Sequence, residues 1–330
     1  MANDEMGIFR LSKLAFHALP NFQRQKYYEL NVPCIDLQEC CLSLLKIVKL
    51  NTEGGYFDPN ADRLSMFDKV KSISNYKFEY ICTTAVGNGH IDCLQFAHKI
   101  GCKWDKFTSA RAASTSLECL MYLQANGCEW DQSTCTQAAT SGFLECLKFA
   151  HEHGCQWTES TCSGAASSGK LDCLMYARAK GCPWDESTCS KAVIAGSLEC
   201  LKYAHEHGCP WNSMTITEAV IHGKFDCLVY ARNNGCPWEE DMLCYIAAAY
   251  GHLNCLRFAH ENGCSWNKYT CAVAAANGYL DVLEYLHENN CPWDTLTCEM
   301  AEKNDEIECL QYATSHGCPR IEPTVSHIHA

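Results

Sequence analysis

The chain has 330 residues, 27 of them cysteine, and a formal net charge of −13 at pH 7. This charge argues against nucleic-acid binding, because phosphate contacts need clustered Lys and Arg. No apolar run approaches the roughly 20 residues of a membrane span, and the first residues lack the apolar core of a secretory signal. We therefore expect a cytoplasmic protein that contacts neither nucleic acid nor membrane.

The N-terminal region, residues 1–76, does not share the pattern of the rest of the chain. Leu37–Leu50 and Arg63–Ile73 have the apolar spacing of amphipathic helices. We predict a helical cap of unclear type that covers the first repeat. An F-box-like module is the alternative, although Leu19–Leu30 matches that pattern poorly.

Residues 77–320 repeat with a period of about 27 residues, and this period decides the fold. The tryptophans mark it at intervals of 26 to 28 residues: Trp104, Trp130, Trp157, Trp184, Trp211, Trp238, Trp266 and Trp293. The intervals between these tryptophans are seven repeats, and one more unit at each end gives nine repeats. A tail follows at residues 321–330. We expect the tryptophans to pack between repeats; a row that stacks on a ligand is the alternative.

Each repeat contains the signals of two short helices. Asp or Asn follows most of the tryptophans, as in Asp185, and such side chains cap helix N-termini. Gly196 and Gly208 end the two helical segments of that repeat, where a left-handed residue is needed. Helices of about ten residues are marginal alone, so stacking must stabilise them. The sequence predicts an all-α solenoid of stacked helix-turn-helix units with no strands.

The repeat cysteines fall into three columns. Column one lies in the first helix: Cys82, Cys135, Cys162, Cys189, Cys244, Cys271 and Cys298. Column two lies in the second helix: Cys93, Cys119, Cys146, Cys173, Cys200, Cys227, Cys255 and Cys309. Column three follows the closing glycine: Cys102, Cys128, Cys155, Cys182, Cys209, Cys236, Cys264, Cys291 and Cys318. Ile216 replaces cysteine in column one and Val282 in column two, which indicates small buried apolar positions. We expect reduced, mostly buried thiols.

A metal site is the competing interpretation of these cysteines. The segments His151–Cys155 and His205–Cys209 both read His-Glu-His-Gly-Cys, and imidazole and thiolate are zinc ligands. Only two repeats carry both histidines, and the repeats contain no Cys-x-x-Cys. We therefore expect no metal and no cofactor, with the histidines exposed at the end of the second helix, where they suit the helix dipole.

The second helix and its flanks resemble ankyrin repeats. Gly196–Cys209, Gly251–Cys264 and Gly278–Cys291 are similar to the glycine-led second helix of that family. The 27-residue period leaves little room for the ankyrin β-hairpin finger, and Ser-Thr-Cys at Ser187–Cys189 replaces the usual Thr-Pro-Leu-His start. The chain looks like the compact "GCPWD" repeats of protists and of the large DNA viruses that infect them. The resemblance implies an ankyrin-like solenoid and protein binding, without a particular partner.

An enzyme would need one irregular constellation of catalytic groups, whereas nearly every Cys, His and Asp here recurs with the period. We therefore expect a non-enzymatic scaffold or adaptor, monomeric, that binds a protein partner. A metal-binding or redox-buffering cysteine-rich protein is the alternative.

The positions that vary between repeats predict the binding surface. In the first helices the early repeats carry small polar residues there, whereas the later repeats carry larger ones. The candidate partner-binding residues are Lys191, Glu218, His222, Tyr245, Tyr250 and Asn277. In ankyrin-like arrays this first-helix face is concave. Ile194, Ile221 and Ile246 lie on the same helices, where packing against adjacent repeats is the alternative role.

Overall fold

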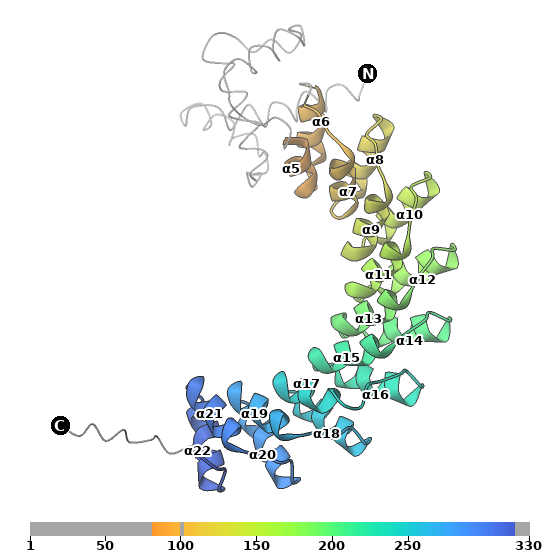
Figure 1. Cartoon of the computed structure of the whole chain (residues 1–330). Coiled ribbons are helices and arrows are strands. Elements are labelled where there is room, and N and C mark those ends of the chain that lie inside the picture. Colours follow the sequence, from red (N-terminus) through yellow and green to blue (C-terminus); the bar gives the residue numbers. More distant parts are fainter. Residues whose placement is uncertain (1–80, 100–101, 321–330) are drawn as a thin grey trace, which may run out of the picture. The chain divides into compact units, whose positions relative to one another are not determined.

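A computed structural model of the chain describes residues 81–99 and 102–320. These residues divide into two compact units, one ending at Thr161 and one beginning at Cys162. Eighteen helices form nine consecutive pairs in the described ranges, and no strand occurs in them (Figure 1). The predicted cap at residues 1–76 and the tail at residues 321–330 lie outside the described residues.

The helices alternate between the first and the second member of a pair. In the first unit they are α5 (Ile81–Gly87), α6 (Ile91–Lys99), α7 (Lys106–Ala113), α8 (Leu117–Ala125), α9 (Gln132–Ser141) and α10 (Leu144–Glu152). The boundary falls within α11 (Glu159–Ser167). The second unit continues with α12 (Leu171–Ala179), α13 (Glu186–Ala195), α14 (Leu198–Glu206), α15 (Ser213–Ile221), α16 (Phe225–Asn233), α17 (Leu243–Ala249), α18 (Leu253–Glu261), α19 (Lys268–Ala276), α20 (Leu280–Glu288), α21 (Thr295–Lys303) and α22 (Ile307–Ser315).

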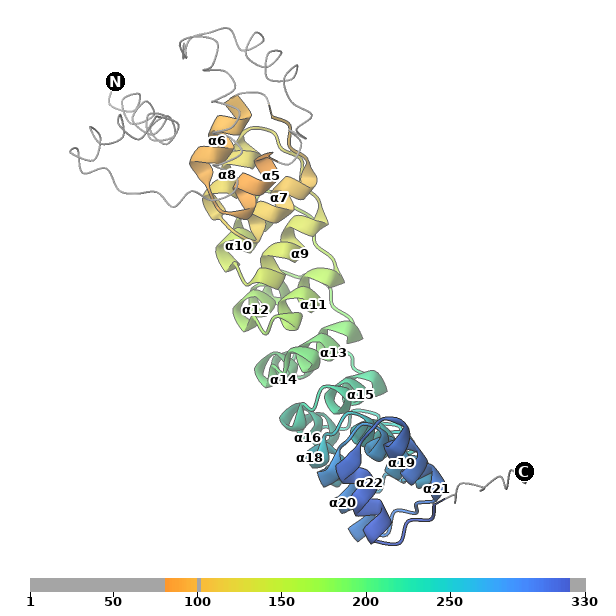
Figure 2. The same cartoon turned by 90° about the vertical axis from the view of Figure 1, so that its left-hand side faces the viewer.

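Packing within each unit follows two rules. First helices other than α11 pack against their own second helix, and most of them also pack against the next first helix, as α19 does with α20 and α21. Second helices also pack on one another, as α18 does with α20. Figure 2 shows these pairs from a second direction. The expected fold class is confirmed for the described residues: an all-α array of stacked helix pairs without strands.

The helix ends agree with the predicted signals. Six side chains after tryptophan accept a backbone N–H bond at a first-helix N-terminus: Asp105, Asp131, Asp185, Asn212, Asn267 and Asp294. Helix α17 lacks such a cap; it begins late, after Met242, and has seven residues. Asn290 and Asp305 replace glycine with φ of 64° and 60°. The repeat that has Glu239 after its tryptophan, in place of Asp or Asn, therefore has a short and uncapped first helix.

The core is a line of small side chains rather than a central cluster. Helix α14 buries Cys200, Leu201 and Ala204, and the equivalent positions are buried in the neighbouring second helices. Helices of about nine residues obtain most of their stability from this packing. Within the described residues no helix has both the length and the apolar character needed to cross a membrane.

Candidate functional site

The tryptophans form the junctions between repeats. Trp211 is half-buried and lies on the imidazole of His205, at the end of the preceding second helix, with ring centroids 3.9 Å apart. Its ring also makes a T-shaped contact with Tyr230 of the next pair, with ring centroids 6.4 Å apart. Trp266 and Trp293 make the same two contacts with their own neighbours. The expectation that the tryptophans pack between repeats is confirmed at these junctions.

Arginine replaces histidine at two junctions. The guanidinium of Arg178 lies 4.2 Å from the ring centroid of Trp184, and that of Arg232 lies 3.9 Å from Trp238. Cation–π attraction of this kind contributes about 0.5–2 kcal/mol, depending on how far the pair is removed from water. At these junctions the residue six positions before the tryptophan therefore presents either an imidazole ring or a guanidinium group to it.

The expected exposure of the histidines is correct for one member of the His-Glu-His segment and wrong for the other. His207 is exposed and bonds through Nδ1 to the carbonyl of Tyr203 at 2.8 Å. His205 is half-buried, and its Nδ1 lies 2.9 Å from the hydroxyl of Tyr230. His205 is covered because the tryptophan six residues later folds back over it.

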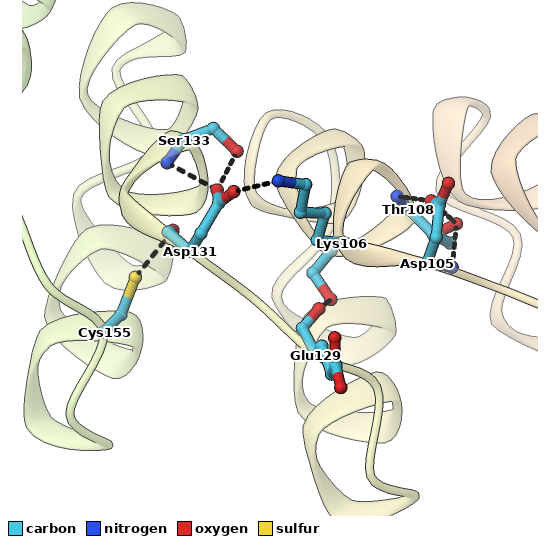
Figure 3. A network of polar contacts seen from close by, with 8 residues as sticks. Asp105, Lys106, Thr108, Glu129, Asp131, Ser133 and Cys155 are labelled. Atoms are coloured by element: carbon cyan, nitrogen blue, oxygen red, sulfur yellow. Dashed lines mark hydrogen bonds and ion pairs between the residues drawn. The ribbon is translucent and has the colours of Figure 1, made fainter.

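All 24 repeat cysteines are buried, as predicted. The column-three thiols have a specific bond that the sequence did not reveal. The thiol of Cys155 donates to the backbone carbonyl of Asp131 at 3.2 Å (Figure 3), and Cys209 makes the same bond to Asp185. The acceptor is the N-cap residue of the first helix of the same pair. Each such thiol therefore connects the loop that closes a repeat to the point where the repeat begins.

Burial favours the neutral form of a thiol. It raises the pKa of Cys255 to about 11 and that of Cys236 to about 12. In Cys162 a hydrogen bond with the Cys182 thiol and then burial raise the pKa. Because thiolate is the form that reacts and binds metal, high pKa values disfavour both reactions. Within the described residues no group of three or more His, Cys, Asp or Glu side chains could hold a metal ion.

An ion pair connects two repeats in the first unit. Lys106 Nζ lies 3.0 Å from Asp131 Oδ2, and Asp131 also accepts from the backbone and hydroxyl of Ser133 (Figure 3). The bonds from Ser133 and then Lys106 lower the pKa of Asp131 to about 2. The equivalent pair in the second unit joins Lys268 to Asp294 at 2.8 Å. These carboxylates serve the scaffold as caps and inter-repeat contacts.

The structure brings most of the predicted partner-binding residues to the C-terminal ends of the first helices. Tyr250 is 50% exposed, and its ring lies parallel to that of His252 at 6.5 Å. Asn277 is exposed and donates through Nδ2 to the carbonyl of Ala249 at 3.1 Å. His222 and Glu218 pair at 3.3 Å. Tyr250, Asn277 and the His222–Glu218 pair therefore lie at equivalent ends of successive helices.

Two predicted residues lie apart from that group. Tyr245 is half-buried within α17, and Lys191 is exposed on α13, two first helices before α17. The isoleucines Ile221 and Ile246 are half-buried, as is Ile194. His252, which was not predicted, contributes through its ring beside Tyr250 and through a bond from Nε2 to the carbonyl of Ile221 at 3.0 Å.

A second feature escaped the sequence comparison of repeats. Met214, Met242 and Tyr269 are 51%, 50% and 53% exposed near the N-terminal ends of α15, α17 and α19. Serine occupies the equivalent position at Ser133, Ser160 and Ser187, whereas Phe107 occupies it in α7 and is 64% exposed. The sequence signal for these exposed side chains was a large residue at the third position after Trp211 and Trp266. The 28-residue step after Trp238 displaced Met242 from that position and obscured the pattern.

No protein-family model and no curated protein matches the chain. Among solved structures, the crystal structure of the human ASB11 ankyrin repeat domain is similar, with 20% sequence identity and a TM-score of 0.43. The match covers 48% of this chain and 84% of that domain. The fold described above depends on the helices and contacts of this chain and not on that likeness.

Proposed function

We propose that the repeats form a non-enzymatic scaffold that binds a protein partner through the first-helix surface of the second unit. The binding residues are Lys191, Glu218, His222, Tyr245, Tyr250 and Asn277. The repeated Cys, Trp and junction His side chains support the array, which leaves the variable positions for recognition. This organisation is typical of solenoid proteins, whose stacked repeats create extended binding surfaces.

The exposed ring of Tyr250 is the observation that supports this proposal best. Half of this side chain is exposed, although the same helix buries Ala247 and Ala248 completely. Tyrosine supplies a large contact area and is enriched at the energetic centres of protein interfaces. His252, beside Tyr250, extends the flat surface, and the His222–Glu218 pair adds polar groups at the corresponding end of α15.

We further propose that the protein acts as a cytoplasmic monomer and that its repeats belong to the compact kind found in protists and their large viruses. Residues 1–76 would cover the first repeat as a cap, and residues 321–330 would form a tail. These assignments rest on the sequence alone.

The test is a double variant, Tyr245→Ala with Tyr250→Ala, measured against a partner that affinity capture from the native cell identifies. Binding should be lost while helicity is retained. Because Tyr245 is half-buried, the single variant Tyr250→Ala separates recognition from stability. Met175→Ala, which changes a 44% exposed side chain on the second helix α12, is the matched control. Full affinity in the double variant would refute the proposed surface.

A further inference from the structure

Three exposed apolar side chains occupy one repeat position in the second unit. We call Met214, Met242 and Tyr269 the apolar row. Each stands directly before a buried residue of its first helix, namely Thr215, Leu243 or Thr270, which are at most 1% exposed. This shared register makes the three positions equivalent although the repeats differ in length. Helices α15, α17 and α19 are successive first helices (Figure 1), and each packs on the next.

The fold does not require large apolar side chains at this position. Ser187 occupies it in α13, where its hydroxyl and backbone N–H both bond to Asp185. A serine therefore completes the start of a first helix, whereas a methionine exposes about half of its surface to water. Grouped exposed apolar side chains on a soluble protein mark interaction sites, and methionine adapts to varied partner shapes.

The surroundings of the apolar row are negatively charged. Glu239, Glu240 and Asp241 are all exposed and directly precede Met242. The hydroxyl of Ser213 donates to Glu239 Oε1 at 3.2 Å, which holds this acidic segment beside the start of α15. The positive charge of Lys268, which precedes Tyr269, is balanced by Asp294 at 2.8 Å. An acidic segment beside an apolar row favours a basic partner.

The spacing of the row favours a helical partner. Packed helices lie about 8–10 Å apart, and seven residues of an α-helix rise about 10.5 Å. Every seventh residue of a helix stays on nearly the same face, with a drift of about 20°. In an extended strand the same distance takes about three residues, and successive side chains at that interval point to opposite faces.

We propose that the apolar row docks a basic amphipathic helix of a protein partner, which places one apolar side chain on each of Met214, Met242 and Tyr269. This surface is independent of the proposed function. Met214 and His222 lie near opposite ends of α15, about 12 Å apart along its axis. The acidic segment Glu239–Asp241 contacts the basic flanks of the docked helix.

The test uses a labelled synthetic peptide of roughly three heptads with leucine at every seventh position and lysine flanking each leucine. Fluorescence anisotropy should show binding to the full chain. The triple variant Met214→Ser, Met242→Ser and Tyr269→Ser should weaken it about tenfold or more, which corresponds to about 1.4 kcal/mol. Serine at the equivalent position of α13 indicates that this variant folds.

Two controls define the chemistry. A peptide with the same leucines and glutamate in place of lysine should not bind, and Glu239→Gln with Glu240→Gln and Asp241→Asn should weaken the basic peptide. Tyr250→Ala should leave peptide binding unchanged, which separates this surface from that of the proposed function. The proposal is overturned if the basic peptide fails to bind the full chain, if the triple variant binds it equally well, or if the acidic peptide binds as tightly.

Discussion

The imidazole of His205 lies flat on the indole of Trp211, with ring planes 11° apart and centroids 3.9 Å apart. The two residues belong to the end of one helix pair and the start of the next. Tyr230 closes the junction from the following second helix, because its hydroxyl bonds to His205 while its ring meets Trp211 edge-on. This arrangement recurs at Trp266 and Trp293, and at Trp104 the imidazole of His98 takes the same place with its ring tilted by 34°.

Replacing Trp211 with alanine should destabilise the second unit. The change removes the contacts with both His205 and Tyr230 and leaves the imidazole uncovered. A fully buried Trp→Ala change costs about 3–5 kcal/mol; for a half-buried indole we expect about 2 kcal/mol. Urea unfolding followed by circular dichroism measures the difference. An unchanged unfolding midpoint would contradict the packing role of the tryptophans.

The two histidines of the same segment provide a matched comparison. His205→Ala removes a ring stack and the bond to Tyr230, whereas His207→Ala affects an exposed ring that bonds to its own helix. We expect the first change to cost about 1 kcal/mol more than the second, in line with the worth of a stacked pair. Equal effects would show that the junction contributes no specific stability.

The sequence predicted the scaffold because its signals are local. Asp185 caps α13 and Gly196 ends it in the left-handed conformation, and both features follow from residue type and position alone. The missing cap of α17 also has a local cause. Glu239 follows the tryptophan, so no Asp or Asn side chain caps the helix, and one extra residue shifts the start of the helix to Leu243.

The candidate surfaces depended on contacts between repeats, which the sequence pattern does not contain. The period identified His205 and Trp211 as recurrent, but their stacking depends on how the loop folds back over the preceding helix. The variable positions predicted Tyr250 and Tyr245 as exposed binding residues; Tyr250 is exposed, whereas Tyr245 is half-buried because it lies within α17. The neighbouring His252 was missed because it begins the second helix of the repeat. The apolar row became visible only when burial fixed the register of Met242.

The glycine that ends α17 should tolerate no side chain. Gly251 has φ of 73°, and a Cβ there would lie 2.5 Å from Cδ1 of Tyr279 in the next pair. Gly251→Ala therefore combines backbone strain of about 1–2 kcal/mol with overpacking of about 1–3 kcal/mol. Thermal unfolding should show a clear loss of stability.

Two further variants separate these causes. Gly263 has φ of 95°, and a Cβ added there would meet no atom within 4 Å, so Gly263→Ala should show the backbone strain alone. Adding Tyr279→Ser to Gly251→Ala should bring its loss close to that of Gly263→Ala, because Ser197 is accommodated at the equivalent position. If the double variant stays as unstable as Gly251→Ala, the clash with Tyr279 is not the cause.

The repeat thiols should be protected from labelling in the native protein. All 24 are buried, and high pKa values such as those of Cys255 and Cys236 lower the thiolate fraction further. A maleimide reagent at neutral pH should modify few of them before denaturation and nearly all of them afterwards. Mass spectrometry counts the modified thiols. A separate sample, whose thiols are trapped at lysis, is used to detect disulfides. Extensive intramolecular disulfides in that sample would contradict the reduced, buried state.

Alkaline pH should destabilise the array through these thiols. An exposed cysteine in the unfolded chain has a pKa near 8.5, whereas burial raises the pKa of Cys255 to about 11. Above about pH 9 the unfolded chain loses this proton and the folded chain keeps it. The unfolded state then binds fewer protons, so the free energy of unfolding falls as pH rises towards about 11. Each such thiol contributes about 1.4 kcal/mol per pH unit within this window.

Cys255→Val isolates one thiol from the other groups that titrate at high pH. Val282 occupies the equivalent position of the next repeat and is fully buried, so the substitution suits the fold. Below about pH 8 the variant and the natural chain should differ little in pH dependence. Between about pH 9 and 11 the variant should lose stability more slowly, since it has one fewer thiol to titrate. Urea unfolding at a series of pH values measures both curves, and parallel curves throughout would show that burial of Cys255 does not shift its ionisation.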